Sequence, residues 1–201
     1  LVWVSGKGKG TPVGVDPPFT TCCADAGIAA AATTTAAIAA WTAGAVSYGQ
    51  DVQEERLRLA ATMLSLSAVR LEPNLRVRHS LDWALHKRWV GVDMAGRAQI
   101  AAALLGASGK LIITPDLLRL APEDKLKRAI GWGLATRLCL RLGGGVPPSR
   151  TESSLTLSDG ELVLQLNDAL RDLVSPAVEN DLRVLAEWTG AIPTLRLMTA
   201  I

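Results

Sequence analysis

Cysteine and flat aromatic rings are scarce in this chain. Three cysteines occur in 201 residues, and Cys22, Cys23 and Cys139 provide neither a disulfide framework nor a C-x-x-C metal spacing. We therefore expect them to be small buried hydrophobic residues. One Phe and one Tyr beside six Trp leave few rings to alternate with basic residues. This composition argues against a single-strand nucleic-acid platform, and we expect no nucleic-acid partner.

Long apolar runs are also missing. No window reaches eighteen uninterrupted apolar residues, so the sequence predicts no membrane-spanning helix. The first ten residues, LVWVSGKGKG, lack the ordered basic, apolar and cleavage regions of a secretory signal. Hydrophobic residues nevertheless make up 49% of the chain, which indicates a folded globular protein. We expect a soluble, cytoplasmic chain without a membrane partner.

The formal net charge of +2 is too small to indicate a nucleic-acid or membrane partner, but the charges are unevenly distributed. Acidic residues outnumber basic ones from Arg150 onward. Between residues 70 and 97 the balance is reversed, with Arg70, Arg76, Arg78, Lys87, Arg88 and Arg97 against Glu72, Asp82 and Asp93. The capacity to bind anions is therefore expected in the middle of the chain.

Glycine and proline divide the chain into parts. Residues 1–16 contain GKGKGTPVG and are interpreted as a linker or a truncated edge. Residues 17–145 show helical spacing of apolar residues, and helix starts are predicted at Pro73, Asp93, Thr114 and Pro122. The helix from Pro73 is expected to continue through Trp89, because Leu75, Leu81, Leu85 and Trp89 recur at helical intervals.

The spacing of apolar residues changes from helical to alternating after the run Gly143-Gly144-Gly145 and the pair Pro147-Pro148. Alternating apolar residues flank Ser158-Asp159-Gly160, which predicts a β-hairpin. Ser175-Pro176 then begins a helix, and Pro193 to Met198 can return as a third strand. Residues 150–201 are therefore predicted to form a small ββαβ module of the α+β kind, after a mainly α-helical bundle of about seven helices.

The segment from Arg76 to Gly106, RVRHSLDWALHKRWVGVDMAGRAQIAAALLG, resembles a known family. It is similar to the helical C-terminal region of the Ppx/GppA exopolyphosphatases and guanosine pentaphosphate phosphohydrolases, where this region reads roughly SLN-x-x-x-H-x-x-x-VGID-x-x-GRA. The likeness covers roughly residues 54–197 in segment order. The residues that carry the motif are Ser80-Leu81-Asp82, His86, Val90-Gly91-Val92-Asp93 and Gly96-Arg97-Ala98.

This resemblance implies an HD-like helical domain followed by the small C-terminal module. It also implies a longer parent enzyme, whose actin-like catalytic domains precede this region and use Mg²⁺, and a homodimer. The substrate would be polyphosphate or pppGpp, between which the sequence does not decide.

The metal site of HD phosphohydrolases is expected to be absent. HD chemistry needs imidazoles and carboxylates on one metal, with a His-Asp dipeptide at its centre. Here His79 is followed by Ser80 and His86 by Lys87, while Leu66 stands where many relatives have an acidic residue. We therefore predict no metal, no cofactor and no catalytic residue in this chain.

The basic residues of the central segment are the candidate phosphate-binding site. Guanidinium groups pair bidentately with phosphate, and lysine adds a mobile charge. On one continuous helix, Arg76 and Lys87 would share a stripe while Arg78 and Arg88 project to the side. The full predicted set is Arg76, Arg78, His79, His86, Lys87 and Arg88.

A purely structural or protein-interaction domain is the alternative. The basic residues would then be ordinary solvated side chains, and the two histidines would be solvated or hydrogen-bonded without a ligand. Salt-sensitive polyphosphate binding by the chain would separate the two hypotheses. Four tryptophans in apolar helical patterns are expected in the core under either hypothesis: Trp83, Trp89, Trp132 and Trp188.

Overall fold

The computed structural model describes residues 33–45, 52–143, 149 and 151–198. The predicted linker at residues 1–16 lies outside this part of the chain, as do Cys22 and Cys23. Helical residues 33–43 are followed by α2 (Val52–Ala68), α3 (Pro73–His86), α4 (Met94–Ala107), α5 (Pro115–Leu118) and α6 (Glu123–Arg141). The C-terminal elements are β1 (Ser153–Ser158), β2 (Glu161–Asn167), the 3-10 helix η1 (Asp168–Leu173), α8 (Pro176–Thr189) and β3 (Ile192–Met198).

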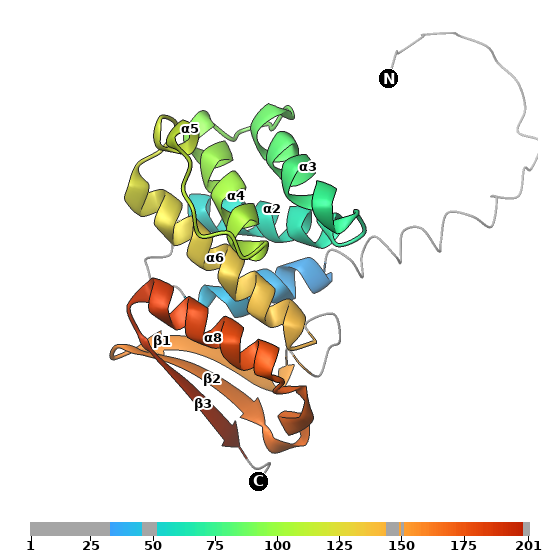
Figure 1. The fold of residues 1–201 in the computed structure, drawn as a ribbon, viewed down its shortest axis with the longest axis vertical. Helices are drawn as coiled ribbons and strands as arrows, with labels where there is room; N and C mark the ends of the chain where they lie inside the picture. The colour runs from blue at the N-terminus through green and yellow to red at the C-terminus, as the bar shows by residue number, and fades with distance from the viewer. Residues whose placement is uncertain (1–32, 46–51, 144–148, 150, 199–201) are drawn as a thin grey trace, which may run out of the picture.

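The prediction of a mainly helical protein that ends in a small sheet is confirmed. Figure 1 shows the helices α2 to α6 in the upper part of the molecule and the three-stranded sheet below them, with α8 between α6 and the sheet. β1 pairs antiparallel with β2, and β2 pairs parallel with β3 through the α8 crossover. The ββαβ order expected from the sequence is therefore present.

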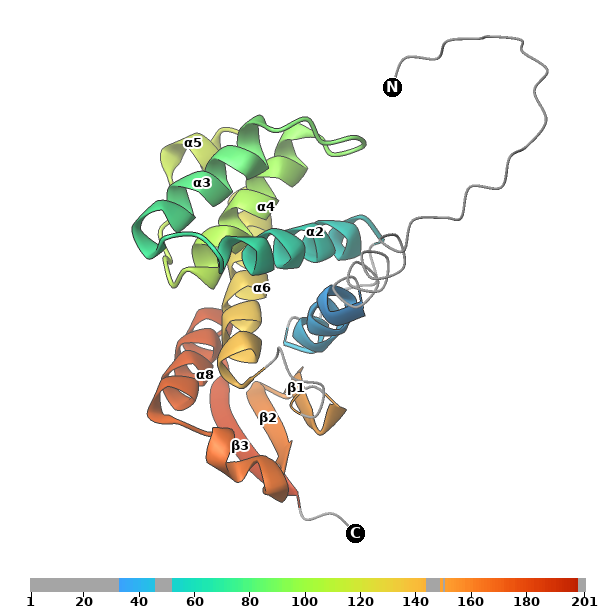
Figure 2. The same cartoon turned by 90° about the vertical axis from the view of Figure 1, so that its right-hand side faces the viewer.

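The hairpin has the predicted turn. Asp159 and Gly160 both adopt positive φ angles, of 51° and 79°, which suits the turn that joins two adjacent antiparallel strands. The outer side of β1 is also paired, because the backbone N–H of Leu157 donates to the carbonyl of Gly44 over 2.9 Å. Figure 2 shows helical residues 33–43 close to β1.

Two glycines bring α4 and α6 into close contact. A Cβ on Gly133 would overlap the carbonyl oxygen of Ala103, and a Cβ on Gly106 would overlap that of Ile130. Backbone therefore packs directly against backbone at this crossing. Large side chains fill the space around it, including Trp132, which is 2% exposed.

One hydrophobic core joins the helices α2 to α6 to the sheet. Leu138 of α6, Leu164 of β2 and Leu185 of α8 belong to the same buried cluster. The predicted boundary between residues 145 and 150 falls almost entirely outside the described residues, and the division into two domains stays a prediction. The shared core means that α8 and the sheet are packed against α6 wherever that boundary lies.

Polar contacts attach α2 to its neighbours. Arg128 of α6 donates to the carboxylate of Glu54 over 2.6 Å, and Arg58 donates to the carbonyl of Ala39 over 3.1 Å. Burial lowers the pKa of the Arg58 guanidinium, since its desolvation outweighs the attraction of Glu55 and Glu54.

The helix predicted from Pro73 through Trp89 is shorter than expected. α3 ends at His86, and Lys87 is already extended, with φ −70° and ψ 152°. The chain folds back at this point, because the indole N–H of Trp89 donates to the carbonyl of Trp83 over 3.2 Å. The core placement expected for Trp83 is wrong, since 37% of this residue is exposed.

Among the described residues, no helix has the length and apolar character that crossing a bilayer requires.

Candidate functional site

The predicted phosphate-binding residues lie on α3 and just beyond its end, but they do not all face the same way. Arg78, His79, His86, Lys87 and Arg88 are exposed, whereas Arg76 is half-buried. Two hollows lie on opposite sides of α3. One is lined by Arg78, His79 and His86, and the other by Arg76.

The first hollow is an open groove of about 840 Å³ along one side of α3. Three of the predicted residues, Arg78, His79 and His86, line it together with Lys110 from the loop after α4. Asp82 also lines the groove and lies 3.1 Å from His86 Nδ1, where it offsets part of the positive charge. We call the set Arg78, His79, His86 and Lys110 the α3 groove.

Lys110 was not among the predicted residues. It lies on a different element from the α3 residues, so no local pattern connects it with them. The only signal in the sequence is a lysine that directly follows the glycine at the end of a predicted helix.

Lys87 lies outside the groove and contacts Trp83. Its Nζ atom is 5.5 Å from the centroid of the Trp83 ring, and the His79 ring lies 5.2 Å from the same indole. A cation over an exposed indole gains about 0.5–1 kcal/mol. Arg88 is exposed and does not line the groove.

Arg76 turns to the other side of α3. Its Nη2 donates to the carbonyls of Val69 and Leu71, at 3.0 and 3.1 Å, and so closes the turn between α2 and α3. The predicted stripe of Arg76 and Lys87 is therefore wrong. These carbonyls hold Arg76 inward, and Lys87 follows the end of the helix.

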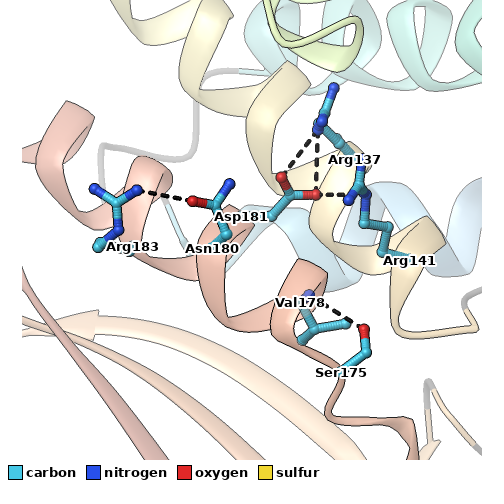
Figure 3. Close-up of polar contacts among 7 residues, drawn as sticks. All are labelled: Arg137, Arg141, Ser175, Val178, Asn180, Asp181 and Arg183. Carbon is cyan, nitrogen blue, oxygen red and sulfur yellow. Dashed lines mark hydrogen bonds and ion pairs between the residues drawn. The ribbon is translucent and has the colours of Figure 1, made fainter.

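A second charged cluster joins α6 to α8. Asp181 of α8 is 5% exposed and lies between two arginines of α6 (Figure 3). Arg137 Nε is 3.1 Å from both carboxylate oxygens of Asp181, and Arg141 Nε is 2.9 Å from Oδ2. The two arginines themselves are 27% and 40% exposed, so the buried carboxylate fixes two guanidinium groups that still reach the surface.

These arginines line the second hollow, a partly enclosed cavity of about 270 Å³ between α2, α3, α4 and α6. Arg76 lines the same cavity from α3, and Leu104 and Leu140 provide apolar wall. We call Arg76, Arg137 and Arg141 the arginine pocket. Sequence reasoning missed Arg137 and Arg141, although two arginines four residues apart in the apolar run RLCLR are a recognisable signal.

The described residues contain no group of three or more His, Cys, Asp or Glu side chains that could hold a metal ion. His79 and His86 both line the α3 groove beside Asp82, which gives this surface hydrogen-bonding capacity for an anion. The two hollows differ in shape: the groove is wide and open, and the pocket is smaller and walled by arginines.

Comparison with other proteins adds no further evidence on function. The sequence matches no protein-family model and no curated protein.

Proposed function

We propose that this chain is a C-terminal accessory domain of a Ppx/GppA-type phosphohydrolase and binds a run of consecutive phosphates, as in polyphosphate or pppGpp. The α3 groove carries the proposal, because Arg78, His79, His86 and Lys110 come from two separate parts of the chain and line one open hollow. In this proposal the chain has an HD-like helical domain, forms a homodimer and works in the cytoplasm.

The motif that carries the family resemblance has a clear structural basis. Gly91 adopts a φ of 71° in the turn after α3, and Asp93 caps α4 by accepting from the backbone N–H of Gly96 over 2.7 Å. Ala98 is fully buried. The motif therefore specifies the turn that places α4 against α3, which is the framework of the groove.

The shape and charge of the groove suit an extended anion. Polyphosphate repeats its charge along a flexible chain, and an open groove allows several weak contacts at once. Arg78 provides a planar fork for phosphate oxygens, and Lys110 provides a point charge. Such exposed contacts are screened by salt over about 8 to 10 Å, so affinity should fall as ionic strength rises.

Hydrolysis is proposed to take place elsewhere in the parent protein. In this proposal, catalysis and Mg²⁺ belong to the actin-like domains that the resemblance implies. In this proposal the chain supplies affinity for the substrate and has no catalytic residue or cofactor of its own.

A structural or protein-interaction role is the alternative, and one observation favours it. Leu64, Leu71 and Trp83 line a small apolar hollow of about 100 Å³ together with His79. A protein partner could cover this surface, and the basic residues would then be incidental.

Removal of the groove charges separates the two functions. The variant Arg78→Gln/His86→Gln/Lys110→Gln should bind long polyphosphate about tenfold more weakly at low salt, since exposed charge contacts contribute roughly 0.2–1 kcal/mol each. Fluorescence anisotropy with labelled polyphosphate of several lengths measures this change, and pppGpp serves as the competing ligand.

The matched control is Arg171→Gln/Arg183→Gln. It removes two formal charges from exposed side chains that pair locally, with Asp168 and Glu187. Its affinity should stay within about twofold of the wild type if the contacts are local rather than a general charge effect. An equal loss in both variants, or no binding by the wild type, would favour the structural alternative.

A further inference from the structure

We propose that the arginine pocket is a separate binding site for one compact phosphate group, held between Arg137 and Arg141. The inference goes beyond the proposed function of the α3 groove and does not depend on it. The ligand is a tetrahedral phosphate, either free inorganic phosphate or the end group of a polyphosphate chain.

The arginine pocket has more positive than negative side chains, which favours an anion as its ligand. Three arginines line the pocket, and Asp181 is the only carboxylate that pairs with any of them among the described residues. Arg76 donates only to two carbonyls, and its Nε is buried without a hydrogen-bond partner in that part of the chain. Partial enclosure strengthens the attraction between these positive charges and a bound anion.

Asp181 acts as the positioning residue. Both arginines of α6 contact it through Nε, so the carboxylate fixes the direction of each guanidinium group without using its Nη atoms. Figure 3 shows the outer end of the Arg137 side chain extending away from Asp181. The Nη groups are the ends of the fork that can donate two parallel hydrogen bonds to phosphate oxygens.

Gly109 leaves room for this arrangement. A Cβ on Gly109 would lie 2.5 Å from Nη1 of Arg137, so the guanidinium group lies directly over the glycine. Any larger residue at this position would move the fork. The loop after α4 therefore places Gly109 against Arg137 and contributes Lys110 to the groove.

The size of the pocket selects for a small ligand. Its volume of about 270 Å³ lies below the roughly 300–1,000 Å³ of sites for drug-sized molecules. The hydroxyls of Ser65 and Ser108 already donate to the helix carbonyls of Ala61 and Leu104. Among the side chains that line the pocket, the arginines and the Ser80 hydroxyl are therefore the donors available to the anion, while Leu104 and Leu140 contribute apolar wall.

Titration calorimetry of the full chain with inorganic phosphate, and separately with tripolyphosphate, tests the site. Arg141→Gln removes one fork and leaves Asp181 paired with Arg137, and should weaken phosphate binding about tenfold or more, the loss expected for a charge-assisted contact. The control is Arg183→Gln. Arg183 lies on the same helix as Asp181, but its side chain points away from that carboxylate, so the variant should change the affinity for phosphate less than about twofold.

A second variant keeps the test valid if Arg141→Gln folds poorly. Arg137→Gln/Arg141→Gln/Asp181→Asn replaces the cluster with neutral groups of similar size and leaves no buried charge unpaired. It should abolish binding of inorganic phosphate and retain a wild-type circular dichroism spectrum.

If Arg141→Gln loses affinity for both inorganic phosphate and tripolyphosphate, the pocket is a site for phosphate end groups. If it loses affinity for inorganic phosphate alone, the pocket is a site for the free ion. The α3 groove variant should still bind inorganic phosphate, so failure of the groove proposal would not affect this result. Unchanged phosphate affinity in Arg141→Gln, or a wild-type dissociation constant weaker than about 10 mM, would overturn the proposal.

Discussion

Gly133→Ala is expected to lower the free energy of unfolding by about 3 kcal/mol or more, at the upper end of the range for an overpacked core. The new Cβ would overlap the Ala103 carbonyl oxygen and lie 2.6 Å from the backbone nitrogen of Ala107. Both are backbone atoms of α4, so relief requires the two helices to separate. The intrinsic gain of alanine over glycine in a helix, about 1 kcal/mol, acts in the opposite direction.

Urea unfolding followed by circular dichroism measures this loss, and Gly96→Ala is the control. A Cβ on Gly96 would meet side-chain atoms of Val92, Asp93 and Leu57, at 2.9 to 3.1 Å, and side chains can shift more easily than backbone. Gly96→Ala should therefore lower the free energy of unfolding clearly less than Gly133→Ala does. A Gly133→Ala variant as stable as the wild type would contradict the direct packing of the α4 and α6 backbones at this crossing.

Asp181→Ala is expected to lower the free energy of unfolding by about 2–3 kcal/mol. Removal of one partner of a buried ion pair costs about 3–5 kcal/mol, because the remaining charge is left without compensation. The loss should be at or below the lower end of this range, since Arg137 and Arg141 stay 27% and 40% exposed and water can solvate them in part.

Thermal unfolding of Asp181→Ala with and without inorganic phosphate tests this value. The control is Asp168→Ala, whose partner Arg171 is 66% exposed and which should cost no more than about 0.5 kcal/mol. A ligand that binds only the folded state raises the midpoint by an amount that grows with the logarithm of its concentration divided by its dissociation constant. A loss at Asp181 as small as that at Asp168 would contradict the role of the carboxylate in joining α6 to α8.

The elements whose ends carry capping or turn residues were predictable from the sequence. Asp93 and Ser175 do cap α4 and α8, and the Asp159-Gly160 turn joins β1 to β2. These signals are local, because a side-chain oxygen satisfies a backbone N–H three residues later. The order of helices and strands followed from such signals.

The end of α3 was not predictable in the same way. The apolar spacing of Leu85 and Trp89 continues the helical period, but the chain must turn before Asp93 to begin α4. The turn is formed by an indole that donates back to Trp83 and by Gly91. Periodicity reports which residues meet an apolar surface, and it does not report where the backbone reverses.

The composition of the two basic sites depended on contacts between distant residues. Arg76 is drawn away from the groove by the carbonyls of Val69 and Leu71, and Lys110 joins the groove from another loop. The pairing of Arg137 with Asp181 joins residues on different helices. Such contacts depend on how helices pack, which one sequence does not reveal.

Chemical-shift mapping of the full chain during a polyphosphate titration tests the central claim most directly. If the α3 groove binds polyphosphate, the backbone amide signals of residues 74–86 and of Lys110 should move together, in fast exchange, and return toward their starting positions as salt is added. Signals in β3 and on the outer face of α8 should stay unchanged. Shifts spread evenly over all basic residues, or no shifts in α3, would contradict the account.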